Sequence, residues 1–443
     1  MTNALEDAVQ KNYDLFDNNQ KNAVNSILDQ WNSPEGDFFF PIIDGPPGTG
    51  KTAVGTIAAA KYLLENKRGQ IAYLSYTHFA VDKAKKDLHS LGLPKDKVVE
   101  LHYNSKVRNW NEGTYGCDSQ LHFVSFNDKR RLKDCGILLS TLHACRRVFK
   151  LRTRPKVLVD EFSQVSVPLF FSVLRKIFAE RCNPEGYALL GDPIQLPVIS
   201  TQSLLRPNIG IYVMQRKPHV PHKLIVQHRM HKNICEAVNS LRTVYHTHKI
   251  ETGKETSDRD LSNLGYSWKK AKVERDLSEI IDPDNPLVIV NTDKYGEEER
   301  VFGGSVINVG EAQIAGKIAE QFKDSYTKEG KSLEPWILSP YAAQIGEIKQ
   351  KIPQELARNC ITIYKSQGRE TPCVIISFVR NNQKGRIGFL GGGTDFHMKE
   401  QTYVGCSRAK GKLILLLSFD TFLGHGFTEF EALVRTKGVH IVD

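Results

Sequence analysis

A glycine-rich segment near residue 45 has the composition that phosphate binding requires. It fits the pattern GxxxxGK[ST] in full and consists of Gly45, Pro46, Pro47, Gly48, Thr49, Gly50, Lys51 and Thr52. Glycines allow successive backbone N–H groups to surround phosphate oxygens, and a helix that starts directly after them adds the positive end of its dipole. In this pattern the Lys51 ammonium reaches the β- and γ-phosphates of ATP, and the Thr52 hydroxyl ligates Mg²⁺. The segment therefore predicts a site for ATP and Mg²⁺.

Polar groups also follow two later apolar runs. Val157–Val159 is followed directly by Asp160 and Glu161. Adjacent acids at the end of a strand are more often a solvated turn, but a Mg²⁺ ion beside a glycine-rich loop needs a second anchor, which Asp160 would supply. Glu161 is then placed to orient or deprotonate the attacking water. The other run ends in GDPIQLP, where Gln195 is a candidate sensor of the γ-phosphate.

These residues can act together only if strands bring them to one edge of a sheet. Short apolar runs alternate with longer amphipathic stretches, which is typical of parallel sheets covered by helices. In the first half the predicted strands are Phe38–Ile43, Gln70–Tyr76, Gly136–Thr141, Lys156–Val159 and Tyr187–Leu190. In the second half they are Lys223–Val226, Leu287–Asn291, Trp336–Ser339, Cys360–Tyr364, Cys373–Phe378 and Lys412–Leu417.

The pattern predicts an α/β protein with two tandem domains. We expect the first domain to span residues 1–215 and the second to span 216–443. A small insertion is expected within 88–136. The least structured stretch should be 249–285, which is polar and rich in Lys, Asp and Glu, so that it forms an insertion or a long connection.

The composition is that of a globular chain with an excess of positive charge. The 443 residues carry a formal net charge of +10, which is compatible with a polyanionic partner. No run of about 18 apolar residues occurs and the N-terminus is too polar for a signal peptide, so we expect no membrane partner. The eight cysteines form no CxxC pair and no zinc spacing. We expect the cysteines to be small buried hydrophobic residues. Their free thiols indicate a reducing compartment, the cytoplasm or the nucleus. We also expect the protein to be a monomer.

Six motifs occur in a fixed order: GPPGTGKT, DEFSQ, GDPIQLP, QHRMH, KSQGRE and CSRAK. This order resembles the superfamily 1B helicases, in the up-frameshift-like branch that includes senataxin and the immunoglobulin-switch-region-binding helicase. The resemblance runs from about residue 15 to residue 418. It implies two RecA-like P-loop domains and an ATP- and Mg²⁺-dependent motor that moves 5′ to 3′ on single-stranded nucleic acid. RNA is favoured over DNA because the motifs are most similar to those of the RNA-surveillance member.

The resemblance assigns further residues to the nucleotide. It implies that Arg229 and Arg408 are arginine fingers, whose guanidinium groups stabilise the charge that spreads over the γ-phosphate. Gln20 in LFDNNQ is similar to the glutamine that reads the adenine edge, and Glu370 is expected to contact the ribose or the outer shell of the metal. His228 stands where the family usually has a tyrosine that stacks on adenine. Since imidazole has a smaller face, base selectivity is expected to be looser or ATP binding weaker.

Other positions resemble the motifs that grip the nucleic-acid strand. In the expected first domain they are Thr77, His78, Val81, Ser140 and Thr141. In the second they are Pro340, Tyr341 and Ser366, with Tyr341 as a platform on which bases stack. A basic segment is a further candidate track for the phosphate backbone, although a solvated basic face is an alternative. It contains Lys129, Arg130, Arg131, Lys133, Arg146, Arg147, Lys150, Arg152, Arg154 and Lys156.

Three hypotheses about the function remain open at this point. The first is an active helicase or translocase, and the second is a nucleic-acid-binding ATPase clamp that remodels complexes without separating strands. The third is another P-loop enzyme, such as a nucleotide kinase or a ring ATPase, but such enzymes lack the downstream arginine motifs. Because only a short segment precedes LFDNNQ in this sequence, we expect the family's usual β-barrel and zinc domain to be missing there and the grip on the strand to be weaker.

Overall fold

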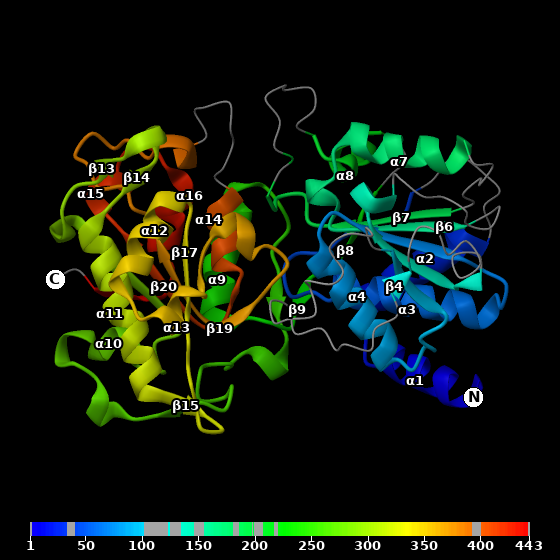
Figure 1. Cartoon of the computed structure of the whole chain (residues 1–443), viewed down its shortest axis with the longest axis horizontal. Coiled ribbons are helices and arrows are strands. Elements are labelled where there is room, and N and C mark those ends of the chain that lie inside the picture. Colours follow the sequence, from blue (N-terminus) through cyan, green and yellow to red (C-terminus); the bar gives the residue numbers. More distant parts are fainter. Residues whose placement is uncertain are drawn as a thin grey trace. The chain divides into compact units, whose positions relative to one another are not determined.

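The computed structural model describes residues 2–32, 40–101, 123–124, 134–145, 155–179, 186–196, 198, 207–216, 220–391 and 400–441. The chain divides into two compact units (Figure 1). The first unit comprises Met1–Pro193 and Pro197–Ile225, and the second comprises Ile194–Leu196 and Val226–Asp443. The division therefore falls ten residues beyond the predicted 215/216 boundary, because the segment up to Lys223 still pairs with the first sheet.

The first unit is built on an eight-stranded sheet whose described strand pairs are all parallel. In spatial order the strands are β4 (Phe123–Val124), β3 (Val98–Leu101), β5 (Ile137–Thr141), β2 (Ile71–Ser75), β6 (Lys156–Asp160), β7 (Gly186–Gly191), β1 (Ile42–Asp44) and β8 (His222–Lys223). The helices are α1 (Thr2–Asp14), α2 (Asn18–Asn32), α3 (Lys51–Glu65), α4 (His78–Ser90), α6 (Leu142–Cys145), η2 (Phe162–Gln164), α7 (Val167–Ala179) and α8 (Ile209–Met214).

Both faces of this sheet are covered (Figure 1). Leu158 packs into the core formed with α2, α3 and α4, whereas its neighbours Val157 and Val159 pack into the core formed with α7 and α8. A strand buried on both faces reads as a continuous apolar run rather than an alternating one. This is why strands such as Lys156–Val159 were recognisable in the sequence.

The second unit is built on a six-stranded sheet, again with parallel pairs throughout. Its order is β18 (Cys360–Thr362), β17 (Trp336–Ser339), β19 (Thr371–Ser377), β20 (Ala409–Leu417), β12 (Leu287–Asn291) and β21 (Val439–Ile441). Its α-helices are α9 (Lys232–Val244), α10 (Ser278–Ile281), α11 (Val309–Ser325), α12 (Ala342–Lys351), α13 (Gln354–Ala357), α14 (Glu400–Cys406), α15 (Phe419–Phe422) and α16 (Thr428–Val434). The predicted α/β architecture with two tandem parallel sheets is confirmed.

Smaller elements decorate this unit. The short strands are β9 (Val226–Gln227), β10 (Glu251–Thr252), β11 (Ser267–Trp268), β13 (Glu299–Arg300), β14 (Val306–Ile307), β15 (Tyr326–Lys328) and β16 (Lys331–Ser332). The 3-10 turns are η4 (Lys254–Thr256), η5 (Lys270–Lys272), η6 (Arg275–Leu277), η7 (Asp293–Tyr295), η8 (Phe302–Gly304), η9 (Ile363–Ser366) and η10 (Gly388–Gly391). No helix of the described segments is both long enough and apolar enough to cross a membrane.

Two sequence predictions need correction. The predicted strand Lys223–Val226 is divided between β8, which extends the first sheet, and β9, which pairs with β10. The stretch 249–285 is less loose than expected, because Leu261, Leu277 and Ile281 are buried in the same core as α11, while its assignment as an insertion or a long connection stays a prediction. Its polar composition hid these few apolar anchors. Most of the insertion predicted within 88–136 lies outside the described residues, which there include the end of α4, β3 and β4.

Candidate nucleotide-binding site

The glycine-rich loop joins β1 to the N-terminus of α3. Gly48 and Gly50 have φ values of 84° and 82°, in the left-handed region that glycine adopts without strain. A Cβ atom at Gly45 would collide with Cγ of Lys51, so this position also has no room for a side chain. Inside the loop, the Thr49 hydroxyl donates a hydrogen bond to the Pro46 carbonyl at 2.8 Å. The loop thus has the tight backbone that phosphate binding needs.

Lys51 lies in the first turn of α3 and is buried. Its Nζ atom donates a hydrogen bond to the Gly45 carbonyl at 2.5 Å, so the ammonium is folded back along the loop that precedes it. An ammonium held there by a single backbone oxygen is well placed to exchange that contact for phosphate oxygens.

Thr52, the next residue, contacts the acidic end of β6. Its hydroxyl donates to Asp160 Oδ2 at 3.1 Å, and the Tyr73 hydroxyl donates to the same oxygen at 2.8 Å. Burial raises the pKa of Asp160, and the charge of the neighbouring Glu161 raises it further, whereas Lys51 opposes both effects. A buried carboxylate beside a hydroxyl is the donor set that a hard divalent cation prefers. Thr52 and Asp160 therefore fit Mg²⁺.

Glu161 has an unusual backbone conformation. Its φ is 59°, and its N–H donates to Asp160 Oδ1 at 2.9 Å. Non-glycine residues in this region are uncommon and often occur at functional sites. Its Oε2 atom is buried and accepts no hydrogen bond from any of the described residues. An acceptor left without a donor beside the Mg²⁺ ligands is suited to orienting a water molecule and taking its proton.

Gln20 holds the glycine-rich loop. Its Nε2 atom donates to the Thr49 carbonyl at 3.0 Å, and its Oε1 atom accepts from the Asp17 N–H at 3.1 Å. Asp17 Oδ1 in turn accepts from the Gln20 N–H, which completes a capping box at the start of α2. Since both amide atoms already have partners, Gln20 would have to exchange one of these bonds to read an adenine edge.

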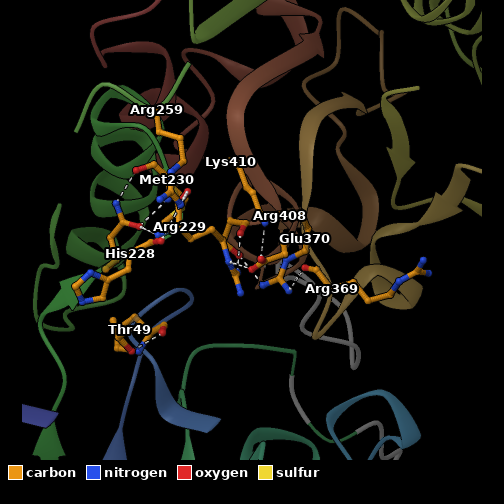
Figure 2. A network of polar contacts seen from close by, with 12 residues as sticks. Thr49, His228, Arg229, Met230, Arg259, Arg369, Glu370, Arg408 and Lys410 are labelled. Atoms are coloured by element: carbon orange, nitrogen blue, oxygen red, sulfur yellow. Dashed lines mark hydrogen bonds and ion pairs between the residues drawn. The ribbon is translucent and has the colours of Figure 1, made fainter. Parts of the chain in front are cut away.

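The second unit gathers a group of cations near the start of β20, and Figure 2 shows Arg229, Arg408 and Lys410 around Glu370. Arg229 donates from Nη1 to the Ser407 carbonyl at 3.0 Å, and its Nε lies 2.6 Å from Glu370 Oε2. The geometry of this second contact is that of an ion pair rather than a well-aligned hydrogen bond. Lys410 Nζ lies 2.8 Å from the other carboxylate oxygen of Glu370. Glu370 thus links Arg229 to a cation that sequence reasoning missed, although Lys410 belongs to the CSRAK motif.

Arg408 is enclosed instead of projecting from the second unit. Its side chain is 1% exposed. Its three nitrogens donate to the Val404 carbonyl at 2.8 Å, the Arg369 carbonyl at 3.1 Å and the Ser407 hydroxyl at 2.7 Å. To act as an arginine finger, Arg408 would therefore have to break these hydrogen bonds and bind phosphate oxygens instead. Gln195, which belongs to the second unit, is also engaged, since it accepts from Gln367 Nε2 at 3.4 Å.

His228 is paired with an acid. Its Nδ1 atom contacts Glu255 Oε1, and this hydrogen bond is the main reason why the pKa of Glu255 is lowered. The His228 side chain is 38% exposed, so the ring is partly accessible. Arg259 fixes the backbone here by donating to the carbonyls of His228 and Arg229 (Figure 2). The polar cavity beside this pair has a volume of about 430 Å³ and is lined by Lys254, Glu255, Asp258, Arg259, Asn263 and Leu264.

The residues predicted to grip nucleic acid in the first unit differ in exposure. His78 is exposed and Thr77 is half-buried, where its hydroxyl caps α4 by accepting from the Ala80 N–H at 3.3 Å. Val81, Ser140 and Thr141 are buried and shape the backbone instead of presenting side chains. Most of the predicted basic track lies outside the described residues.

Corrections are needed for three further members of this set. Lys156 is buried with its Nζ on the Trp31 carbonyl, because β6 is a central strand, so it cannot belong to a surface track. Tyr341 is only 6% exposed at the residue that precedes α12, so it is not an open stacking platform. Ser366 is buried and donates to the Ile363 carbonyl at 2.6 Å. Pro340 is half-buried at the end of β17.

The geometry of the first unit defines a class of protein. A glycine-rich loop between a central parallel strand and a helix, with an aspartate at the end of a second central strand, is the arrangement of a RecA-like P-loop nucleotide-binding protein. Two models of the AAA domain match the chain, one over residues 39–201 and the other over 210–418.

Related proteins agree with this class. The chain is 28% identical over 433 residues to the DNA replication ATP-dependent helicase/nuclease DNA2 of Mus musculus, a match that covers 89% of this chain and 38% of the relative. It is 28% identical over 412 residues to the helicase/nuclease JHS1 of Arabidopsis thaliana, covering 90% of this chain and 28% of the relative. It is 26% identical over 434 residues to the regulator of nonsense transcripts 1 of Dictyostelium discoideum, covering 86% and 29%. The chain thus spans between 28% and 38% of the length of these relatives.

Among solved structures, the chain resembles the DUF1998 helicase MrfA bound to DNA and AMPPNP, with 10% sequence identity. That match covers 97% of this chain and 54% of the other, with a TM-score of 0.43. The assignment depends on the sequence matches and the sheet topology instead. The chain belongs to the superfamily 1B helicases, in the up-frameshift-like branch, which confirms the resemblance seen in the six motifs.

Proposed function

We propose that this chain hydrolyses ATP with Mg²⁺ and uses the energy to move 5′ to 3′ along single-stranded nucleic acid. The observation that carries the proposal is the cluster of Thr52, Asp160 and Glu161, in which the proposed metal ligands lie beside a buried Glu161 oxygen that accepts no hydrogen bond from the described residues. Bound Mg²⁺ would neutralise charge on the β- and γ-phosphates. This cluster suits phosphoryl transfer to water.

Each residue of the proposed site then has a defined task. Lys51 leaves the Gly45 carbonyl and binds phosphate oxygens, while Glu161 orients the attacking water and accepts its proton. Arg229 supplies a guanidinium for the charge that develops on the γ-phosphate. Because Lys51 and Arg229 belong to different units, we propose that turnover requires both units and that their movement is coupled to the strand.

The substrate is proposed to be single-stranded DNA. DNA replication is part of the name of the Mus musculus and Arabidopsis thaliana relatives. The motif resemblance to the RNA-surveillance helicase, and the similarity to a regulator of nonsense transcripts, support RNA as the alternative. A clamp that hydrolyses ATP on the strand without separating duplexes is the alternative to a motor.

Strand displacement tests these proposals together. The substrates are DNA and RNA duplexes that carry a single-stranded tail at the 5′ or the 3′ end, and Lys51→Ala is the control. We expect ATP-dependent displacement of the 5′-tailed DNA duplex, little displacement of the 3′-tailed one, and none by the variant. Displacement of RNA alone would reverse the substrate assignment. Hydrolysis stimulated by the strand without displacement would identify a clamp, and no hydrolysis would refute the proposed function.

A further inference from the structure

Tyr73 reaches the Mg²⁺ ligands from a neighbouring strand. It lies on β2, which pairs with β6 so that Tyr73 is opposite Leu158 and Ser75 is opposite Asp160. Its ring is completely buried, and its hydroxyl donates to Asp160 Oδ2 at 2.8 Å. None of the six family motifs includes this residue. The tyrosine therefore makes a contact with the carboxylate that neither the motifs nor the comparisons assign.

Among the described residues, three groups donate hydrogen bonds to the Asp160 carboxylate. The Thr52 hydroxyl and the Tyr73 hydroxyl share Oδ2, and the Glu161 N–H donates to Oδ1. Thr52 has its own expected task as a metal ligand, and Glu161 has its own with water. Tyr73 is enclosed and cannot reach a ligand, so its hydroxyl acts on the site only through Asp160.

A glycine inside α3 makes space for this contact. A Cβ atom at Gly55 would lie 3.3 Å from the Tyr73 hydroxyl oxygen and 3.0 Å from Leu190 Cδ2, both tighter than ordinary packing. Glycine in the interior of a helix costs about 1 kcal/mol relative to alanine. The rest of this helix is rich in alanine, in the sequence TIAAAKYLL. The exception at Gly55 is explained if the helix must pass close over the tyrosine hydroxyl.

We propose that Tyr73 is a positioning residue that fixes Asp160 as a ligand for Mg²⁺, and that Gly55 keeps its hydroxyl in reach. The inference rests on the proposed use of Mg²⁺ and ATP at this site, but it concerns metal binding rather than movement on nucleic acid. With the hydroxyl removed, the carboxylate keeps the Thr52 and Glu161 donors but can rotate more freely. The loss should therefore fall on metal affinity and leave the phosphate loop unchanged.

The test compares Tyr73→Phe with Tyr187→Phe, a buried tyrosine of β7 in the same sheet. Binding of Mn²⁺ to the full chain with ADP is measured by electron paramagnetic resonance, and binding of ADP in EDTA is measured by calorimetry. We expect Tyr73→Phe to weaken Mn²⁺ binding about tenfold, in line with a lost hydrogen bond to a charged group. ADP affinity without metal should stay within about twofold, and Tyr187→Phe should change neither. Equal Mn²⁺ affinity in the two variants overturns the proposal.

A double-mutant cycle separates positioning from general packing. Gly55→Ala should weaken Mn²⁺ binding about fivefold in the wild-type background, because the methyl group displaces the tyrosine hydroxyl. In the Tyr73→Phe background the same change should cost at most about twofold. If Gly55→Ala weakens Mn²⁺ binding equally in both backgrounds, Gly55 does not act through the Tyr73 hydroxyl and this part of the proposal is overturned. A wild-type chain that binds Mn²⁺ and ADP as expected but fails to displace strands would refute the motor and leave this proposal standing.

Discussion

At the scale of single residues, the first unit holds the residues that we propose for ATP hydrolysis. Lys51→Ala removes the ammonium that neutralises the phosphates, and Glu161→Gln removes the base for the attacking water. Each change should lower ATP turnover at least about a hundredfold. The melting temperature should stay close to that of the wild type, since Lys51 has one backbone partner and Glu161 Oε2 has none among the described residues. Turnover near the wild-type rate in either variant, measured by phosphate release, would contradict the site.

The two family arginines should behave differently. Arg408 makes three hydrogen bonds inside the second unit, so Arg408→Ala should lower the free energy of unfolding by about 2–4 kcal/mol besides lowering turnover. Arg229 is held by one carbonyl and the Glu370 carboxylate, so Arg229→Ala should keep the fold and lose at least about a hundredfold in turnover. Urea denaturation and steady-state kinetics measure the two effects. A fully stable Arg408→Ala protein with the same loss of turnover would mean that Arg408 is free to act as a finger.

At the scale of elements, the N-terminus of α11 holds a buried acid. Glu311 accepts hydrogen bonds from the Val379 N–H at 2.9 Å and the Thr292 hydroxyl at 3.3 Å, and it thereby fixes Val379 at a φ of 74°. Burial raises the pKa of Glu311 to about 7. A raised carboxyl pKa means that the folded state binds the proton more tightly, so this contribution to stability is complete below pH 4.5 and is lost as the pH rises to about 7.

Replacing Glu311 by glutamine should prevent the fall in the free energy of unfolding that the wild type shows as the pH rises. The amide keeps the size and an acceptor oxygen but never carries charge, so Glu311→Gln should raise the free energy of unfolding at pH 8 by about 1–3 kcal/mol. At pH 4.5 the variant and the wild type should differ little. Urea unfolding at both pH values measures this, with the exposed Glu329→Gln as control. A variant that is less stable than the wild type at pH 8 would show that the ionised carboxylate is required.

The contrast between elements and side chains explains what the sequence could predict. Central strands such as β6 and β20 are buried on both faces, so their apolar runs and the polar residues that end them are visible without a structure. The phosphate loop was equally visible because its glycines are required by backbone geometry. The partners of individual side chains could not be predicted from the sequence, because Tyr341, Arg408 and Tyr73 are buried by segments far away in the chain. Motif spacing gives the position of a residue along a strand and not the partner it meets.

At the scale of the whole molecule, the proposed chemistry is divided between two units. Each unit has its own parallel sheet and its own cores, while Lys51 and Glu161 belong to the first and Arg229 to the second. Under the proposed mechanism, efficient ATP hydrolysis requires both units to contribute. If a nucleic-acid strand binds to both units, it should favour the state in which they cooperate. Turnover should therefore depend on the strand as well as on ATP.

We accordingly expect single-stranded DNA to stimulate ATP hydrolysis and rising salt to abolish the stimulation. Contacts to several phosphates release counterions, so strand affinity should fall at least about tenfold between 50 and 200 mM salt. Fluorescence anisotropy with Glu161→Gln measures the affinity without turnover, and phosphate release by the wild type measures the stimulation. Basal hydrolysis should change much less with salt, because Lys51 and Asp160 are buried. Equal hydrolysis with and without DNA or RNA of any length would show that ATP turnover is not coupled to a strand.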